Sequence, residues 1–454
     1  MRFADEAYWV GPAPATESYL RISALLEVAR RSGADAVHPG YGFLSERPDF
    51  ARACAAAGLV FIGPSAEALA LLGEKTAARR LAREAGVPIV LGPLYPFTDP
   101  EDIALFAREI GFPVMLKAAS GGGGKGMRLV ATRGELEAAI RGAMAEARSA
   151  FGDPSLFLEA YIERARHIEA QFLADAQGTI VWLGERDCSI QRRHQKLIEE
   201  TPGPALDEHV RGRLVEYTVQ IARRAGYVNA GTAEFLVDER GEAFFLEVNA
   251  RLQVEHPVTE AVTRLDLVAL QLAIAAGERL PFGQGDVRRI GHAIECRISA
   301  EDPEHGFAPS AGAVTFVREP SGPGIRVDSA IYPGLVVPTE YDPLLAKVIA
   351  HGRDRPEALA RMRRALRETV VAGVRTTLPF HEHVLDEPDF VAGRYDIGYV
   401  ASHWPSARPA DVDGAVPAAT AALLAERRRR RAPRPPRGGD ESAWRRAARE
   451  DARQ

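Results

Sequence analysis

Residues 244–255 read FFLEVNARLQVE, and this stretch separates apolar from polar side chains by position. The even positions are apolar: Phe244, Leu246, Val248, Ala250, Leu252 and Val254. The odd positions from 247 onward are polar: Glu247, Asn249, Arg251, Gln253 and Glu255. Because consecutive side chains of a strand point to opposite faces, the pattern predicts a β-strand with one buried face and one face of functional groups.

The spacing of the polar residues predicts a shared site. Glu247 and Asn249 are two positions apart on one strand face, close enough to share a metal ion. In a straight strand Glu255 would lie ~26 Å from Glu247, so a bend is required if both serve one site. Pro257 marks the point where strand pairing stops. The alternative is an amphipathic strand at the surface.

The composition is that of a globular protein with two to three domains. The chain has 454 residues, of which 46% are hydrophobic and 26% charged. A net charge of −5 argues against nucleic-acid binding. Cys54, Cys188 and Cys296 show no CxxC spacing, which indicates a reducing compartment. The sequence has no apolar run long enough for a membrane span and no signal-peptide pattern at its start, so we expect a cytoplasmic protein.

The order of predicted elements indicates a mixed fold. Residues 20–62 alternate helix and strand patterns, which predicts a parallel sheet, and an α+β pattern begins near residue 75. Long strands are expected over 156–250 around a helix near 210–225, and a further mixed segment covers 292–400. Beyond 402 the text RRRRRAPRPPRGG (427–439) predicts a flexible tail, with nucleic-acid binding as the less favoured alternative. The fold class is therefore α/β and α+β.

A glycine run between two predicted strands indicates phosphate binding. Residues 113–130 read PVMLKAASGGGGKGMRLV, in which Lys117 precedes Gly121, Gly122, Gly123 and Gly124. Glycine backbones approach phosphate oxygens closely, and lysine supplies positive charge. The run is not a Walker A loop, because Gly126 stands where Ser or Thr is required. A hinged flap over phosphates fits best, and a flexible hairpin turn is the alternative.

Two further patterns predict binding of metal and anions. Glu234 and Glu247 lie on strands joined by a turn at 238–241, which places both carboxylates on one face; with Asn249 they form a set suited to Mg²⁺. Residues 186–200 read RDCSIQRRHQKLIEE, a density of donors that suits several anionic oxygens.

These runs resemble the ATP-grasp superfamily, and more narrowly the biotin carboxylase component of biotin-dependent carboxylases. The resemblance covers about residues 4–400 and includes HPGYGFLSE, KAASGGGGKGMR, ERDCSIQRRHQK, EVNARLQVEHPVTE, ECRISAEDP and YDPLLAK. It implies an incomplete Rossmann-like N-terminal domain (1–73) and an ATP-grasp domain (74–281) with a mobile Gly-rich flap subdomain (about 90–162). A mixed C-terminal biotin carboxylase domain (292–401) and the tail (402–454) would follow.

The resemblance also implies roles for individual residues. The phosphate-binding residues would be Lys75, Lys117, Gly121, Gly122, Gly123, Gly124 and Lys196. The nucleotide pocket would comprise Glu159, Ile162, His167, Gln191 and His194. The ligands of Mg²⁺ or Mn²⁺ would be Glu234, Glu247 and Asn249. Bicarbonate would be held by Arg251, Gln253 and the backbone of Val254, with Glu255 as the base. Arg326 resembles the arginine that steadies the biotin enolate.

The implied reaction is the ATP-dependent carboxylation of biotin with bicarbonate through carboxyphosphate, the first half-reaction of an acetyl- or acyl-CoA carboxylase. The chain has no Met-Lys pair for biotin attachment, so biotin would be carried in trans by a biotin carboxyl carrier protein or biotinyl domain. A carboxyltransferase subunit and a homodimer or larger complex are the other expected partners. The alternatives are another ATP-grasp ligase, such as a carbamoyl-type enzyme, and a shortened, non-catalytic carboxylase subunit.

Overall fold

The computed structural model describes residues 4–119 and 126–404. The glycine run 121–124 and most of the predicted tail therefore lie outside the described residues. Positions 402 and 403, where the tail was expected to begin, belong instead to helix α13 (Tyr399–His403).

Helices and strands mix along the whole described chain, which confirms the predicted α/β and α+β class. The helices are α1 (Ile22–Ser32), α2 (Pro48–Ala56), α3 (Ala66–Gly73), α4 (Lys75–Glu84), α5 (Pro100–Ile110), α6 (Leu136–Phe151), α7 (Glu208–Arg224), α8 (His256–Thr263), α9 (Leu267–Ala275), α10 (Arg355–Glu368), α11 (Leu378–Asp386), α12 (Pro388–Val391) and α13. The strands are β1 (Ala36–Val37), β2 (Val60–Phe61), β3 (Val114–Ala118), β4 (Met127–Val130), β5 (Leu156–Ala160), β6 (Arg166–Ala174), β7 (Ile180–Arg192), β8 (Gln195–Thr201), β9 (Asn229–Val237), β10 (Ala243–Asn249), β11 (His292–Ser299), β12 (Glu301–Asp302), β13 (Ala308–Pro309), β14 (Gly312–Ala313), β15 (Phe316–Arg318), β16 (Ile325–Ser329), β17 (Val336–Val337), β18 (Leu344–Gly352) and β19 (Val370–Ala372).

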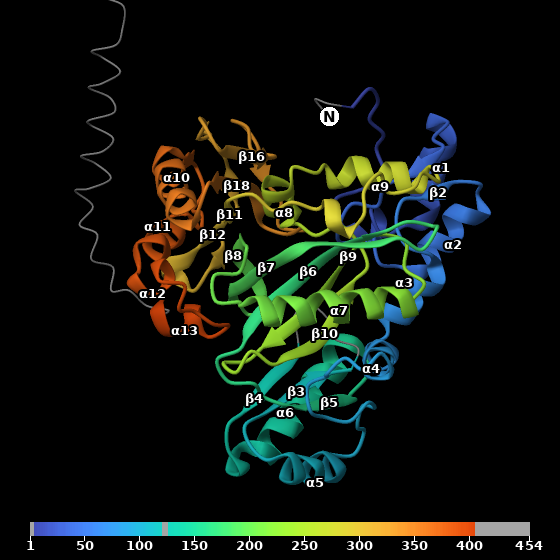
Figure 1. Ribbon diagram of the computed structural model, residues 1–454, viewed down its shortest axis with the longest axis vertical. Coiled ribbons are helices and arrows are strands. Elements are labelled where there is room, and N and C mark those ends of the chain that lie inside the picture. The colour runs from blue at the N-terminus through green and yellow to red at the C-terminus, as the bar shows by residue number, and fades with distance from the viewer. Residues whose placement is uncertain (1–3, 120–125, 405–454) are drawn as a thin grey trace, which may run out of the picture. The chain divides into compact units, whose positions relative to one another are not determined.

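The largest sheet of the described chain runs in the order β10-β9-β6-β7-β8-β11-β18-β16, and its paired strands are antiparallel. Helix α7 lies across the part of this sheet that holds β6, β7 and β10 (Figure 1). A separate sheet, β4-β3-β5, packs with α5 and α6. The parallel pairing predicted for the first segment is confirmed between β1 and β2, although each strand has only two residues.

The decisive stretch 244–255 differs from the single alternating strand that its sequence predicts. Strand β10 ends at Asn249, and a β-bulge at Leu246 separates the pairs Phe245↔Phe235 and Glu247↔Glu234. A bulge inserts one residue into a strand and so reverses the faces that follow it. Phe245 is consequently buried before the bulge and Val248 after it. The bend that the sequence required is supplied by the irregular segment after Asn249.

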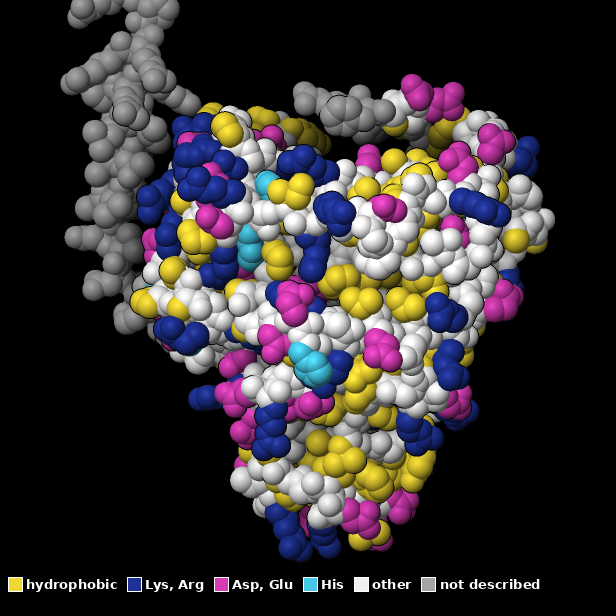
Figure 2. All heavy atoms as spheres, in the orientation of Figure 1, with side chains coloured by type: hydrophobic (Ala, Val, Ile, Leu, Met, Phe, Trp, Pro, Cys, Tyr) yellow, Lys and Arg dark blue, Asp and Glu magenta, His cyan; other side chains and the backbone are white. Residues whose placement is uncertain are grey.

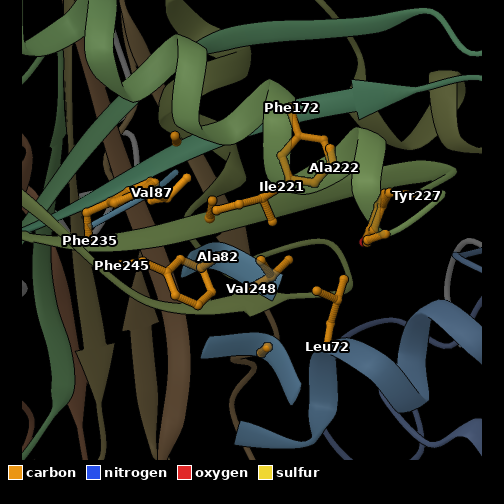
Figure 3. Packing of buried hydrophobic residues seen from close by; sticks show 14 of the residues in the cluster. Leu72, Ala82, Val87, Phe172, Ile221, Ala222, Tyr227, Phe235, Phe245 and Val248 are labelled. Atoms are coloured by element: carbon orange, nitrogen blue, oxygen red, sulfur yellow. The ribbon is translucent and has the colours of Figure 1, made fainter. Parts of the chain in front are cut away.

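The buried side of β10 belongs to the core cluster that holds the N-terminal helices on the central sheet. Figure 3 shows Phe245 and Val248 packed with residues of α3, α4, α7 and β9. Phe235 and Phe245 meet edge to face with ring centroids 6.2 Å apart. This packing fixes the opposite, polar side of β10 relative to its neighbours.

The surface carries charges of both signs. Acidic and basic side chains are interspersed on the face shown in Figure 2. No helix within the described ranges is both long enough and apolar enough to cross a membrane.

A buried ionic cluster centred on Glu200 joins β8 to the C-terminal helices. Its carboxylate accepts hydrogen bonds from Arg355 at 2.7 and 2.9 Å and from the Tyr395 hydroxyl at 2.5 Å, and it lies 2.6 Å from Nε2 of His292. Burial alone would raise the pKa of Glu200, but His292 and Arg355 lower it to about 2. The cluster therefore depends on an ionised carboxylate.

We expect Glu200→Ala to lower the free energy of unfolding by about 3–5 kcal/mol, because it leaves the largely buried guanidinium of Arg355 without its anion. In the wild-type protein this contribution is present above the ordinary pKa of a glutamate and is lost as the pH falls toward about 2. Urea denaturation at neutral and acidic pH measures both effects. Glu208→Ala, at an exposed ion pair on α7, is the control and should cost under about 1 kcal/mol. Equal effects of the two substitutions would contradict this account.

Candidate active site

Lys196 is the centre of the site. It follows a β7–β8 hairpin turn in which Arg193 and His194 both have positive φ, 48° and 65°. Two-residue hairpin turns of this kind require positive φ at both positions, which non-glycine residues adopt only with strain. Such strain is typical of functional sites, and here the strained turn places Lys196 at the start of β8.

The Lys196 ammonium group contacts three carboxylates from different parts of the fold. Its Nζ lies 3.0 Å from Glu234 on β9 and 2.8 Å from Glu255 after β10, and it also contacts Glu169 on β6. Glu169 and Glu255 are fully buried and Glu234 nearly so. Fully buried Arg186 binds the other side of Glu169 at 3.0 Å. Carboxylates packed this closely require cations among them.

Glu255 is held between two cations. Its Oε1 accepts from Lys196 and its Oε2 accepts from Nη2 of Arg297 at 2.9 Å, while Nε of Arg297 binds Glu199 at 2.6 Å. Burial alone would raise the pKa of Glu255, but Lys196, Arg297 and Arg186 together hold it well below its ordinary value. Glu255 is therefore a carboxylate at neutral pH.

The sequence prediction that Glu234 and Glu247 share a face is confirmed by their cross-strand pairing. Asn249 Nδ2 donates to Glu234 at 2.7 Å, and His167 Nε2 lies 3.0 Å from the same carboxylate. His167, Glu169 and Glu234 also form a cluster whose ligand atoms lie within 4.8 Å of one another. Loss of solvation, followed by the negative charges of Glu234 and Glu46, raises the pKa of Glu247. Carboxylates that repel each other in this way fit a divalent cation.

Arg251 is anchored by a residue that the sequence reasoning missed. Its Nε donates to Glu46 at 2.9 Å, and the other Glu46 oxygen accepts from the backbone of Ala250, also at 2.9 Å. Arg251 also donates to Asn249 at 2.8 Å and to Gln253 at 3.0 Å. Glu46 ends the quoted motif HPGYGFLSE, which was the signal for it.

A cavity of about 330 Å³ is lined by residues including Tyr41, His256 and Lys347. Lys347 Nζ donates to the carbonyl of Val254 at 2.7 Å. The cavity therefore adjoins the backbone that carries Glu255.

The residues expected to surround the nucleotide lie on β5, β6, β7 and the β7–β8 turn. Glu159 is buried at the end of β5, where it contacts Lys117 and lies 2.9 Å from Arg79. Burial would raise the pKa of Glu159, but Lys117 and Arg79 lower it. The remaining residues are Lys75 at the start of α4, half-buried Ile162 in the loop after β5, buried His167 and Gln191, and exposed His194.

Arg326 lies apart from this cluster. It is on β16 with its side chain 44% exposed, and it binds Glu260 at 2.6 Å and Asp328 at 2.8 and 3.0 Å. It lines a different cavity, of about 750 Å³. The arginine that contacts Glu255 is Arg297, within the quoted motif ECRISAEDP, to which the sequence reasoning gave no role.

Comparison with known proteins places this geometry in a family. Residues 1–69 match the biotin carboxylase N-terminal domain, residues 74–282 match the ATP-binding domain of the carbamoyl-phosphate synthase L chain, and residues 295–402 match the biotin carboxylase C-terminal domain. Biotin carboxylase 1 of Bacillus subtilis is 47% identical over 404 residues, covering 89% of this chain and 90% of the relative. Biotin carboxylase of Pseudomonas aeruginosa is 48% identical over 401 residues, covering 88% and 89%.

Solved structures indicate the same family. The Campylobacter jejuni biotin carboxylase–β,γ-ATP complex has a TM-score of 0.85 at 44% identity, covering 88% of this chain and 90% of that one. The biotin carboxylase domain dimer of Hydrogenobacter thermophilus 2-oxoglutarate carboxylase, with MgADP, ADP and bicarbonate, also has a TM-score of 0.85 at 44% identity, covering 88% of each chain. The chain belongs to the biotin carboxylase family of ATP-grasp enzymes, whose reaction is the ATP-dependent carboxylation of biotin. The two flanking biotin carboxylase domains exclude the carbamoyl-type alternative.

We expect Glu46→Gln to raise the KM for bicarbonate about tenfold or more while the KM for ATP changes little. Hydrogen bonds to charged groups contribute about 1.5–3 kcal/mol. The hydrogen bond from Arg251 to Glu46 orients the guanidinium that, by the family resemblance, would hold bicarbonate. Steady-state kinetics with each substrate varied in turn measures the effect, with exposed Glu17→Gln as the control. A parallel rise in both KM values would show that Glu46 supports the fold generally.

Proposed function

We propose that the cluster around Lys196 activates bicarbonate with ATP and passes the resulting carboxyl group to biotin. The observation that carries this proposal is the position of Glu255. It is buried and ionised, it lies between Lys196 and Arg297, and it directly follows the segment that contains Arg251 and Gln253. That arrangement supports a base next to an anion-binding arginine.

Bicarbonate would lie on the guanidinium of Arg251, the amide of Gln253 and the backbone of Val254. Glu255 would remove the proton of bicarbonate as a bicarbonate oxygen attacks the γ-phosphoryl group of ATP, which would form carboxyphosphate and release ADP. A carboxylate whose pKa is held low is a weak base. We propose that Lys196 turns from Glu255 to a phosphoryl oxygen when ATP binds, which would restore the basicity of Glu255.

The acidic pair would hold the metal. Glu234 and Glu247, with Asn249, are the proposed ligands of Mg²⁺ or Mn²⁺, which would neutralise charge on the transferring phosphoryl group. We further propose that Lys75, Lys117, Lys196 and the glycine run 121–124 bind phosphate oxygens. The nucleotide pocket would comprise Glu159, Ile162, His167, Gln191 and His194.

The second step would take place at the cavity that Lys347 lines. Carboxyphosphate would break down to CO₂ and phosphate, and the phosphate would take the ureido proton of biotin. The resulting enolate would then attack CO₂. Arg297 contacts the base itself, whereas Arg326 is occupied by Glu260 and Asp328. This geometry favours Arg297 over Arg326 as the cation that stabilises the enolate.

Biotin would reach this cavity on a biotin carboxyl carrier protein or biotinyl domain. A carboxyltransferase subunit would use the product. The Hydrogenobacter relative is described as a dimer, which supports a homodimer here. We propose a cytoplasmic location, from the cysteine usage.

Two glutamate substitutions test the assigned roles. Glu255→Gln should keep Mg-ATP binding and lower bicarbonate-dependent phosphate release by about 10²–10⁴-fold, because it removes the base. Glu247→Gln should instead weaken Mg-ATP binding, because it removes a metal ligand. Calorimetric titration of Mg-ATP and a phosphate assay distinguish the two. If both variants bound Mg-ATP equally badly, this division of roles would be wrong.

Two arginine substitutions test the biotin step. Arg297→Ala should lower carboxybiotin formation by about 10²–10³-fold, the loss typical of one preorganised donor. Arg326→Ala, the matched change outside the cluster, should leave carboxybiotin formation near the wild-type rate. Carboxybiotin formation and phosphate release are measured in parallel. A larger loss of carboxybiotin formation in Arg326→Ala than in Arg297→Ala would assign this role to Arg326 instead.

A further inference from the structure

Glu295 is a fully buried carboxyl group in the middle of β11. It lies directly opposite Glu199 of β8 and Ile349 of β18. Helix α8 covers this face of the sheet, where Val258 and Val262 pack on Ala293 and Ile349. Glu295 is thus enclosed by an apolar helix face and a second carboxyl group.

Among the described residues, neither carboxylate oxygen of Glu295 has a hydrogen-bond partner, and Oε2 of Glu199 has none either. The nearby cations have other partners. Arg297 binds Glu199 and Glu255, and Lys347 binds the Val254 carbonyl and lies 3.4 Å from Asp328.

The other charged groups on this face are also occupied. Arg326, opposite Ile349 on β16, binds Glu260 of α8 and Asp328. His256 of α8 lies 2.7 Å from the carbonyl of Gln253. Glu295 therefore has no described counter-ion of its own.

A count of charges in the connected cluster points the same way. If all were ionised, five carboxylates would face three cations: Glu169, Glu199, Glu234, Glu255 and Glu295 against Arg186, Lys196 and Arg297. A buried carboxylate without a partner takes up a proton. Burial, followed by the negative charge of Glu199, raises the pKa of Glu295 well above its ordinary value.

We propose that Glu295 is a neutral, protonated acid that positions Arg297: because it carries no charge, it leaves the guanidinium to Glu199 and Glu255. An ionised Glu295 would compete for Arg297 and draw it away from Glu255. The protonation state of Glu295 is inferred from its burial, its position opposite Glu199 and its lack of a described hydrogen-bond partner. Its catalytic part rests on the proposed role of Arg297.

The protonation state has a measurable consequence for stability. A glutamate whose pKa is raised by folding contributes stability that is fully present below its ordinary pKa and is lost as the pH rises toward its pKa in the folded protein. One such proton changes the unfolding equilibrium constant about tenfold per pH unit in that range. Glu295→Gln has nearly the shape of the neutral acid, but its side chain does not titrate.

The first experiment compares denaturation of the full-length wild-type protein, Glu295→Gln and the exposed control Glu319→Gln from about pH 6 to about pH 9. Glu295→Gln should gain stability over the wild type as the pH rises, by up to about tenfold in the unfolding constant per pH unit, while Glu319→Gln follows the wild type. A difference that does not change with pH, or a Glu295→Gln protein that fails to fold at neutral pH, would overturn the proposal.

The second experiment measures biotin carboxylation over the same pH range. Glu295→Gln should stay within a few-fold of the wild type at neutral pH and lose less activity than the wild type on the alkaline side. A loss of about 10²-fold or more at neutral pH would mean that a charge at this position is required, which contradicts the proposal. If the wild type itself showed no bicarbonate-dependent turnover, the proposed function would fail, and the denaturation experiment would still decide the state of Glu295.

Discussion

The contact of one buried ammonium group with three carboxylates determines how this site is built. Lys196 binds Glu169, Glu234 and Glu255, which come from β6, from β9 and from the segment after β10. Without that cation the buried carboxylates would repel one another, and removing one partner of such a cluster typically costs about 3–5 kcal/mol. The order β10-β9-β6-β7-β8 in the central sheet allows these groups to meet.

The same contact links ATP to bicarbonate in the proposed mechanism. Lys196 keeps Glu255 ionised but also makes it a weak base, since the ammonium stabilises the charged form. Phosphate oxygens of ATP would compete with Glu255 for Lys196. Proton removal from bicarbonate would then become favourable only when the phosphoryl group that it attacks is in place. Coupling of this kind prevents ATP hydrolysis without carboxylation.

Part of this site could be predicted from the sequence because its signals are local. The sequence predicted that Glu234 and Glu247 share a face, and they do pair across β9 and β10, but only because a bulge at Leu246 shifts the register between them. The bulge at Leu246 could not be predicted from the sequence. Phe244, Phe245 and Leu246 are all apolar, so an inserted residue among them does not interrupt the apolar pattern. Arg297 was missed because its partners Glu199 and Glu255 are 98 and 42 residues away, and only strand pairing brings them together. Arg326 lies in a similar alternating segment, and the sequence alone does not distinguish the two.

The most direct test of the account is phosphate release from Mg-ATP by the purified chain, measured in buffer freed of bicarbonate and again after bicarbonate is added. If Lys196 and Glu255 couple the two substrates, release should require bicarbonate and should increase further with free biotin. Phosphate release at the same rate with and without bicarbonate would contradict the account, because ATP would then react without the anion that Glu255 is proposed to activate.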